Sequence, residues 1–518
     1  MTTRPAPIRI LLAGHSGVSK SRIIDRISEA LQKENKSLRH VKFEKSQMDH
    51  ILAGTPNTVD QKETVLEFAR KAITEVETAS DSVDLIILSM HLSYFASGLI
   101  IQPQSWHVTD GQTNEIEPII FKYIVGKFAP HYVATIIDDI QAAHRKVKSA
   151  NVTLKDLLRW RNAETYSADS IANLTHFYAG SKRSLAIPAN QSDIFELYPY
   201  EFSPVIASRN DVRSFTRFFL NKDLPRVYSS FPISRPRTLE DPKKSEATIA
   251  EINRHNAWLC SKFTVFNPAA IDELPMVKAL EQFLKGKGDK PVSLDERITI
   301  EAGHHWPLDW GKTIIGEART AVDLFVKDVF EISARLYAQT RDSPTQHSDA
   351  PSTGAEQMLR LIDDESTRLP GQSVAGKSDL DYQIAERDFR MIDQSDCVVI
   401  YRPTLNSKNK KYDGKWSGGT QEEYRYALGV DRKVVVIRDT SHDLELDEDK
   451  LGLLVSAFRI LNGSNLHLAE NQNAMHLELE DWIQKNVDKN VQERVRQTEQ
   501  MLSAMATSSA DDAINQAK

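Results

Sequence analysis

Short apolar runs alternate with helical patterns along most of this chain, and this alternation limits the folds available to it. Residues 8–13 (IRILLA), 83–89 (VDLIILS) and 132–137 (YVATII) are apolar runs of strand length, and helical patterns at 20–32 and 59–78 separate them. Strands that alternate with helices form parallel sheets through crossover connections. We therefore predict an α/β fold.

The alternation starts a second time in the carboxyl-terminal half. A strand that runs into a loop is expected at 224–234. Helices are expected after it at 246–261, 381–394 and 421–428, and strands at 263–266, 397–401 and 433–437. A chain of 518 residues is also too long for one ordinary hydrophobic core. We predict two parallel-sheet, Rossmann-like domains.

These patterns place the domain boundaries. We expect one domain at 1–221 and a second at 224–470, the second with an insertion at about 289–372. Residues 471–518 read as a helical tail, and its polar pattern from residue 491 onward predicts a helix that frays.

Composition and charge narrow the setting. The formal net charge of −7 provides no overall basic field to attract nucleic acid. Two cysteines, Cys260 and Cys397, provide no disulfide framework, which is typical of a reducing compartment. Residues 1–8 lack the apolar core of a signal peptide, and no run approaches the roughly 18 apolar residues of a membrane span. We expect a cytoplasmic protein without a membrane or nucleic-acid partner.

A glycine-containing turn follows the first predicted strand and opens the first predicted helix. The turn reads GHSGVSKS, with Gly14, Gly17, Lys20 and Ser21 at its key positions. Backbone N–H groups and the positive end of a helix can hold phosphates there. The turn resembles the Walker A loop of P-loop kinases and ATPases, over about the first 200 residues. That resemblance implies ATP with Mg²⁺, with Lys20 at the outer phosphates and the Ser21 hydroxyl on the metal.

One position of this turn departs from the family pattern. Ser19 stands where the family has glycine, which lets the backbone turn tightly against phosphate. The departure favours nucleotide binding without turnover. The alternative interpretation of the whole motif is a glycine turn with a solvated lysine.

Polar residues after the third predicted strand are further candidates for the phosphate site. Asp138 and Asp139 directly follow that strand, where related folds keep a carboxylate for metal or water; the alternative is a helix cap. Arg145, Arg159 and Arg161 are candidates to clamp phosphates as kinase lid arginines do, and otherwise are ordinary surface arginines.

Four segments of the second half carry a second resemblance. They are VYSSFPISRPR (227–237), FTVFNPAA (263–270), DFRMIDQSDCVVIY (388–401) and SGGTQEEYRYA (417–427). In this order they resemble the nucleoside 2-deoxyribosyltransferase superfamily, over about 224–470. The resemblance implies a deoxyribosyltransferase-like fold and a homo-oligomer.

The resemblance also assigns two catalytic carboxylates. Asp388 and Glu423 match the catalytic aspartate and glutamate of the family. Breaking an N-glycosidic bond builds positive charge on the anomeric carbon, which a carboxylate such as Glu423 can attack or stabilise. Asp388 with a raised pKa is expected to protonate the departing base. For either residue alone, an ordinary helix-face carboxylate is the alternative.

The residue before the last glycine pair indicates the substrate. The transferase branch has an aspartate where this chain has Ser417, and a hydroxyl there resembles the branch that hydrolyses nucleoside 5′-monophosphates. An aspartate would repel a phosphate, whereas a hydroxyl can donate to it. Gly418 and Gly419 would leave backbone N–H groups to help.

Residues around the first strand of this domain complete the expected substrate site. Arg237 matches an arginine of the hydrolase branch and Ser234 can hydrogen-bond the same phosphate. Tyr228 matches the tyrosine on the family's first strand. Phe231 stands where a glycine is usual, and its ring is expected either to narrow the pocket or to stack on a base.

We therefore predict a nucleotide N-glycosidase that hydrolyses the base–sugar bond of a nucleoside 5′-monophosphate or related nucleotide. It would be coupled to an ATP-binding P-loop domain that acts as a switch, or as a kinase or ATPase. Two alternatives stay open: a nucleoside deoxyribosyltransferase, and a nucleotide sensor or defence effector that binds without turnover.

Overall fold

The structure is a computed structural model. It describes residues 6–42, 59–79, 83–96, 99–101, 107–109, 116–118, 120–139, 143, 146–147, 154–184, 202–208, 210, 212–233, 242–271, 375–403, 418–438, 463–467 and 472–516. The predicted insertion at about 289–372 lies outside these residues. The predicted α/β class is confirmed, because the described residues form two five-stranded parallel sheets with helices packed around them.

The first sheet has the strand order β2-β3-β1-β8-β9, and its neighbouring strands are parallel. Its strands are β1 (Ile8–Ala13), β2 (Leu38–Lys42), β3 (Leu85–Ser89), β8 (Tyr132–Ile137) and β9 (Val205–Ala207). β3 and β8 are buried along their whole length, as suits central strands covered on both faces. From the carboxyl end of β1 the chain runs to β2, on one side of the sheet. From the carboxyl end of β8 it runs to β9, on the other side. The two connections therefore leave in opposite directions from the neighbouring strands β1 and β8.

Helices and two short antiparallel pairs surround this sheet. In α1, the buried residues Ile23, Ile24, Ile27 and Leu31 form one apolar face, which explains why this stretch packs as a helix. The elements are α1 (Lys20–Lys33), α3 (Val59–Ala79), the π-helix η2 (Ile120–Phe128), α5 (Leu154–Ser184), α6 (Val212–Leu220), and the strand pairs β4 (Tyr94–Ala96) with β5 (Leu99–Ile101) and β6 (His107–Thr109) with β7 (Ile116–Pro118).

The second sheet has the order β11-β10-β12-β13-β14, again with parallel neighbours. Its strands are β10 (Arg226–Ser230), β11 (Thr264–Phe266), β12 (Cys397–Tyr401), β13 (Lys433–Arg438) and β14 (Gly463–His467). Its helices are α8 (Pro242–Lys262), the short 3-10 helix η6 (Pro268–Ala270), α13 (Ala375–Asp393) and α14 (Gly418–Gly429). The chain leaves β10 towards β11 and later returns to β12 on the other side, so the connections diverge between β10 and β12.

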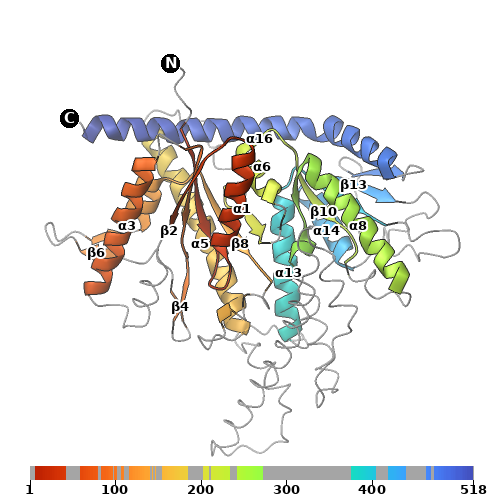
Figure 1. The fold of residues 1–518 in the computed structure, drawn as a ribbon, viewed down its shortest axis with the longest axis horizontal. Coiled ribbons are helices and arrows are strands. Elements are labelled where there is room, and N and C mark those ends of the chain that lie inside the picture. Colours follow the sequence, from red (N-terminus) through yellow and green to blue (C-terminus); the bar gives the residue numbers. More distant parts are fainter. Residues whose placement is uncertain are drawn as a thin grey trace, which may run out of the picture.

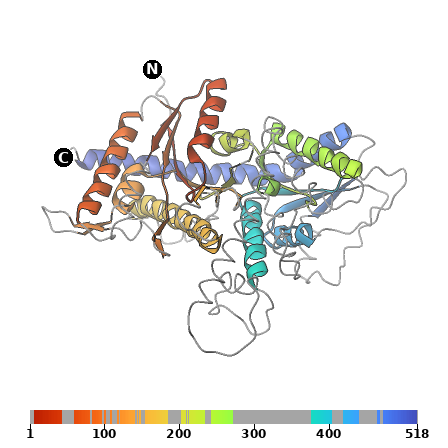
Figure 2. The same ribbon diagram turned by 60° about the horizontal axis from the view of Figure 1, so that its bottom comes forward.

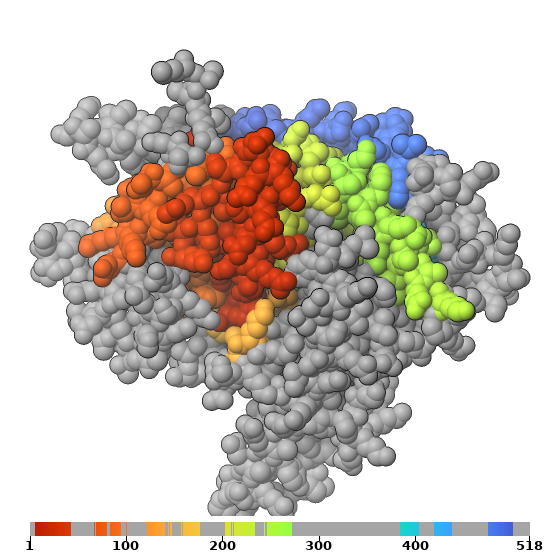
Figure 3. Space-filling view, in the orientation of Figure 1, coloured from red at the N-terminus to blue at the C-terminus, as the bar shows by residue number. Residues whose placement is uncertain are grey.

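One hydrophobic core joins the two sheets. A single cluster of buried side chains contains members of β8, β9, α6, β11 and β12, among them Ile136, Val205, Phe218, Phe266 and Val398. Figure 3 shows α6, in yellow, between the surfaces of α1 and α8. The two units, each a sheet with its helices, are therefore packed against each other through this shared core.

A side chain at the end of α13 completes the edge of the first sheet. The Gln394 amide donates to the carbonyl oxygen of Val205 at 2.8 Å and accepts from the Val205 N–H at 3.0 Å. It thereby satisfies backbone groups on the edge strand β9, as a neighbouring strand would.

Helix α16 (Gln472–Gln516) extends across the width of the molecule beside both sheets (Figures 1 and 2). The prediction that it frays from residue 491 is wrong at least as far as Thr498, because Val491, Arg494 and Thr498 are buried. The Arg494 guanidinium donates to both oxygens of Asp396, at 2.8 and 2.9 Å. It also donates to the carbonyl oxygens of Lys222 and Leu224.

The contacts of Asp396 place α16 at the edge where β10 and β12 begin. Asp396 precedes β12, and its carboxylate accepts from the N–H of Arg226, the first residue of β10, at 2.7 Å. Candidate sites at the carboxyl ends of these strands therefore lie on the side opposite α16. Among the residues described, the structure contains no helix long and apolar enough to cross a membrane.

The buried Arg494–Asp396 pair predicts a large effect on stability. Replacing Arg494 with methionine leaves the Asp396 carboxylate buried without its cation, so we expect the free energy of unfolding to fall by about 3–5 kcal/mol. Urea unfolding monitored by circular dichroism measures this change. Arg496→Met on the same helix is the matched control, because Arg496 is itself exposed and pairs with the exposed Glu493, and its unfolding midpoint should stay at the wild-type value. Equal midpoints for the two variants would contradict the assignment.

Candidate functional site

Glu423 lies at the point where the connections of the second sheet diverge. It projects from α14 towards the carboxyl end of β10, where two side chains of that strand hold its carboxyl group. The Tyr228 hydroxyl donates to one oxygen at 2.9 Å, and the Ser230 hydroxyl donates to the other. Residues two apart on a strand face the same side, which explains why Tyr228 and Ser230 reach the same group.

Asp388 and Arg387 form the adjoining part of this site. Both residues are buried on α13, and the Arg387 Nε donates to the Asp388 carboxylate at 2.9 Å. The charges of Asp388 and Arg387 both act on Glu423. The structure therefore brings together Glu423, Asp388 and Tyr228, which the sequence selected, and adds Ser230 and Arg387.

Burial controls the protonation of this site. Burial, and then the negative charge of Asp388, raise the pKa of Glu423 from its ordinary 4.5 to about 8, although the hydrogen bonds from Ser230 and Tyr228 lower it. Burial and the two carboxylates also raise the pKa of the Tyr228 hydroxyl well above 10. At neutral pH the free site therefore holds a proton on Glu423 and an un-ionised Tyr228.

The expected raised pKa of Asp388 stays a prediction. Asp388 has an arginine partner at 2.9 Å, and Glu423 is a buried group of this site whose pKa rises to about 8. Glu423 and Asp388 therefore form a carboxyl pair in which Glu423 carries a proton at neutral pH.

The other predicted residues of this site have different outcomes. Gly418 and Gly419 form the start of α14, five and four residues before Glu423. Ser417, Ser234 and Arg237 lie outside the described residues. Phe231 directly follows β10 and is buried in a core cluster that includes Val227 and Ile252, whereas Tyr228 belongs to the other cluster.

The turn after β1 has two glycines in backbone conformations that other residues rarely adopt. Gly14 and Gly17 have φ angles of +152° and +92°, which other residues rarely adopt. A Cβ on Gly14 would lie 2.8 Å from the Ile136 carbonyl oxygen, and one on Gly17 would lie 2.7 Å from that of Ala143. Both positions therefore require glycine, for conformation and for space.

Lys20 lies over this turn. Its ammonium group donates to the Gly14 carbonyl oxygen at 2.6 Å and lies 3.2 Å from Nδ1 of His91, which follows β3. Ser21 is exposed on the first turn of α1. Both residues lie in the first turn of α1, where the positive end of a helix favours an anion.

A fully buried carboxyl group from α5 supports the same turn. Glu164 accepts hydrogen bonds from the N–H groups of Gly14 (2.9 Å) and Leu92 (2.8 Å), and from the Ser93 hydroxyl (2.6 Å). Burial raises the pKa of Glu164, and the charge of Lys20 is the largest of the influences that lower it. Glu164 therefore connects the turns after β1 and β3 to helix α5.

The remaining candidates for the phosphate site differ in burial. Asp138 and Asp139 are buried at the end of β8, and Asp138 lies 3.9 Å from the Lys146 ammonium. Arg161 is buried, Arg159 is exposed, and Arg145 lies outside the described residues.

His15, inside the turn, is fully buried. Burial lowers its pKa to about 4, so its imidazole is neutral at physiological pH, with Nδ1 2.7 Å from the Ser16 carbonyl oxygen. The charges of Arg161, Lys20 and Asp138 all act on it, which places these three side chains around the turn.

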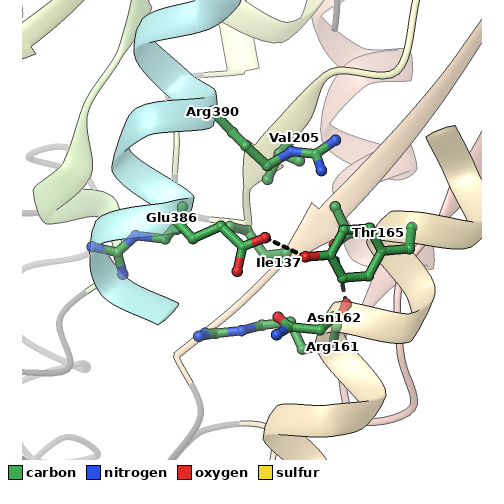
Figure 4. Close-up of a pocket in the computed structure, with 9 residues that line it drawn as sticks. Ile137, Arg161, Asn162, Thr165, Val205, Glu386 and Arg390 are labelled. Atoms are coloured by element: carbon green, nitrogen blue, oxygen red, sulfur yellow. Dashed lines mark hydrogen bonds between the residues drawn. The ribbon is translucent and has the colours of Figure 1, made fainter. Parts of the chain in front are cut away.

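A small pocket lies where α5 faces α13 (Figure 4). It encloses about 20 Å³, which is space for about one water molecule and far too little for a nucleotide. Arg161 lines one wall and Arg387 and Arg390 line the other. It is therefore a junction between the units and not a substrate site.

The sequence did not indicate three of these residues as site members. The period-two pattern of a strand could have selected Ser230, because it lies two residues after Tyr228. No sequence signal selects Arg387 beside Asp388. Glu164 lies 150 residues from Gly14, so only the fold brings them together.

Comparison with known proteins adds no assignment: no family model matches this chain, and no curated protein matches it. In the part of the chain that the structure describes, no group of three or more histidine, cysteine, aspartate or glutamate side chains could hold a metal ion.

The raised pKa of Glu423 predicts a specific dependence of stability on pH. Because the folded protein keeps this proton up to about pH 8 and the unfolded chain releases it near 4.5, raising the pH through this interval lowers the free energy of unfolding. The loss is at most about 1.4 kcal/mol per pH unit. Denaturant unfolding of wild type and Glu423→Gln between pH 5 and pH 8 should show this extra loss in wild type alone.

The neighbouring Glu422 supplies the control for this measurement. Its side chain is 61% exposed, so Glu422→Gln should follow the wild-type curve. Identical pH dependence in wild type and Glu423→Gln would show that Glu423 does not hold the proton.

Proposed function

We propose that this protein is a nucleotide N-glycosidase that hydrolyses the base–sugar bond of a nucleoside 5′-monophosphate or related nucleotide. The observation that carries the proposal is the buried Glu423 held by Tyr228 and Ser230, next to Asp388. Buried carboxyl pairs with shifted pKa values are typical of catalytic sites.

The topology of the second sheet supports the proposal. Counted from β10, its order is 2-1-3-4-5, the order of flavodoxin-like sheets. Such sheets bind ligands at the carboxyl ends of strands one and three, where the connections diverge. Here those strands are β10 and β12, and Glu423 contacts the end of β10. This agrees with the deoxyribosyltransferase-like fold that the sequence implies.

The carboxyl pair can supply both the nucleophile and the acid. Glu423 must lose its proton before it attacks the anomeric carbon, and Asp388 is the neighbouring carboxylate that can accept it. The bond from Glu423 to the anomeric carbon forms as the bond to the base breaks, and Asp388 passes the proton to the departing nitrogen. Water then cleaves the ester on Glu423 and releases the sugar phosphate, with Asp388 accepting the proton of the water.

The turn after β1 supports an ATP·Mg²⁺ site in the first unit. Gly14 and Gly17 have the required backbone, and Lys20 and Ser21 lie at the amino end of α1. Asp138 at the neighbouring strand end would face the metal. The order β2-β3-β1-β8-β9 puts this turn where the connections of the sheet diverge, which agrees with a P-loop NTPase fold. These residues would bind the phosphates of ATP. Bound ATP would either switch the glycosidase or supply the phosphoryl group of a kinase or ATPase reaction.

A nucleotide sensor is the second candidate function. Ser19, exposed before the first turn of α1, replaces the glycine expected there and favours binding without turnover. A deoxyribosyltransferase is the third, and Ser417 in place of an aspartate argues against it. The resemblance implies a homo-oligomer, and this implication is the same for all three candidate functions.

Base release tests the glycosidase. Chromatography of free bases after incubation with a panel of nucleoside 5′-monophosphates and NAD should detect release by wild type. Glu423→Gln should lower the rate by at least about 100-fold, because the nucleophile is lost.

Glu422→Gln is again the matched control, since it makes the same chemical change one residue away on the exposed side of α14. It should release base at the wild-type rate. No release by wild type from any substrate, in protein that is folded, would refute the proposal and favour the sensor.

Binding of ATP tests the first unit separately. Lys20→Met should weaken the affinity for ATP·Mg²⁺ by about 10- to 100-fold, because a charge-assisted hydrogen bond to phosphate is lost. Isothermal titration calorimetry measures this, with Lys33→Met at the exposed end of α1 as the control. If both variants bind ATP like wild type, the turn is not a phosphate site.

A further inference from the structure

Two side-chain contacts join α5 to α13. The Tyr166 hydroxyl donates to the Glu386 carboxylate at 2.7 Å. One turn further along each helix, Arg390 donates to both oxygens of Asp169, at 2.6 and 2.9 Å. Two contacts one turn apart fix the position of one helix along the other as well as their separation.

At one end of this connection, α5 holds the turn after β1. Glu164 accepts from the Gly14 and Leu92 N–H groups, and the Trp160 indole donates to the Ser93 carbonyl oxygen at 2.9 Å. Glu164 precedes Tyr166 by two residues and Asp169 by five, so it lies within about 8 Å of both along the helix axis.

At the other end, α13 carries the second carboxyl group of the candidate active site. Asp388 and its partner Arg387 lie between Glu386 and Arg390, the two residues that contact α5. Arg387 also lines the small pocket opposite Arg161. A shift of α13 would therefore move Asp388 relative to Glu423, which lies on a different helix.

The turn after β1 contains the group that would respond to a nucleotide. Lys20 donates to the Gly14 carbonyl oxygen, and its charge acts on Glu164. A phosphate bound at this turn would attract Lys20 away from Gly14, because an ammonium–phosphate hydrogen bond is stronger than one to a carbonyl group. Glu164 would then lose the nearby positive charge of Lys20. Release of the Gly14 carbonyl oxygen by Lys20 would also change the hydrogen bond from the Gly14 N–H to Glu164.

We propose that Glu164 senses a nucleotide at the turn after β1, and that the Tyr166–Glu386 and Asp169–Arg390 contacts transmit its presence to Asp388. This regulation rests on the proposed function, since it assumes that the turn binds ATP and that Asp388 serves the glycosidase. Occupation of one site then changes the affinity of the other by the same factor, as thermodynamic linkage requires.

Hydrogen–deuterium exchange tests the link without depending on catalysis. Adding AMP-PNP·Mg²⁺ to wild type should slow exchange in α1 and also in α13, the latter by about 5-fold or more. In Tyr166→Phe/Asp169→Asn, the slowing in α1 should remain and the slowing in α13 should be lost. Tyr166→Phe alone, which removes only an oxygen atom from an exposed ring, should weaken the effect on α13.

Tyr123→Phe is the matched control. Its hydroxyl accepts a hydrogen bond from Arg70 of α3 at 3.3 Å, so the change leaves both contacts between α5 and α13 intact and its response should equal that of wild type. Slower exchange in α1 with unchanged exchange in α13 would overturn the link, and so would an absence of nucleotide binding.

Base release, measured in the same proteins, keeps the two proposals separate. If AMP-PNP·Mg²⁺ alters exchange in α13 but no base is released, the link stands and the glycosidase fails. If base is released at a rate that AMP-PNP·Mg²⁺ changes equally in wild type and in Tyr166→Phe/Asp169→Asn, the glycosidase stands and the proposed route is wrong.

Discussion

The Asp396 carboxylate is the interaction on which the arrangement of the second unit depends. It accepts from the Arg226 backbone at the start of β10 and from the Arg494 guanidinium of α16, while its own N–H donates to the Arg226 carbonyl oxygen. Three elements therefore meet at one buried charge. The pairing fixes β10 beside β12 at their amino ends, and their carboxyl ends then lie together on the opposite side, where Glu423 is held. The residue that organises the strands is thus distant from the residues that would perform chemistry.

The candidate active site shows what burial does to two neighbouring carboxyl groups. Water solvates each charge well, whereas a protein interior does so only through specific partners. Arg387 is the partner of Asp388, and two hydroxyl groups are the partners of Glu423. Burial and the neighbouring Asp388 charge raise the pKa of Glu423, and the two hydroxyl groups offset only part of this rise. A pair that holds one proton suits a reaction that needs both a nucleophile and an acid.

The two units resemble each other in how they create a site and differ in the groups that fill it. In each parallel sheet the connections diverge at a central strand, and the end of that strand is left open for polar groups. The first sheet presents a glycine turn with Lys20, and the second presents Tyr228 and Ser230 to Glu423. The shared core and the contacts of α5 with α13 join these sites through packed helices, so the units are suited to influence each other.

The sequence by itself determined the α/β class and most central strands, because β1, β8 and β12 are apolar runs that only a sheet covered on both faces can bury. It also selected Glu423 and Tyr228, through the resemblance of short segments to a known superfamily. It did not indicate β9 or β14, since a strand of three residues and one reading GSNLH form only where a neighbouring strand supplies the hydrogen bonds. Tertiary structure alone decided three features. They are the proton on Glu423, the support of Gly14 by Glu164, and the burial of Arg494. Each depends on burial and on partners more than 90 residues away, and neither property is encoded in local sequence.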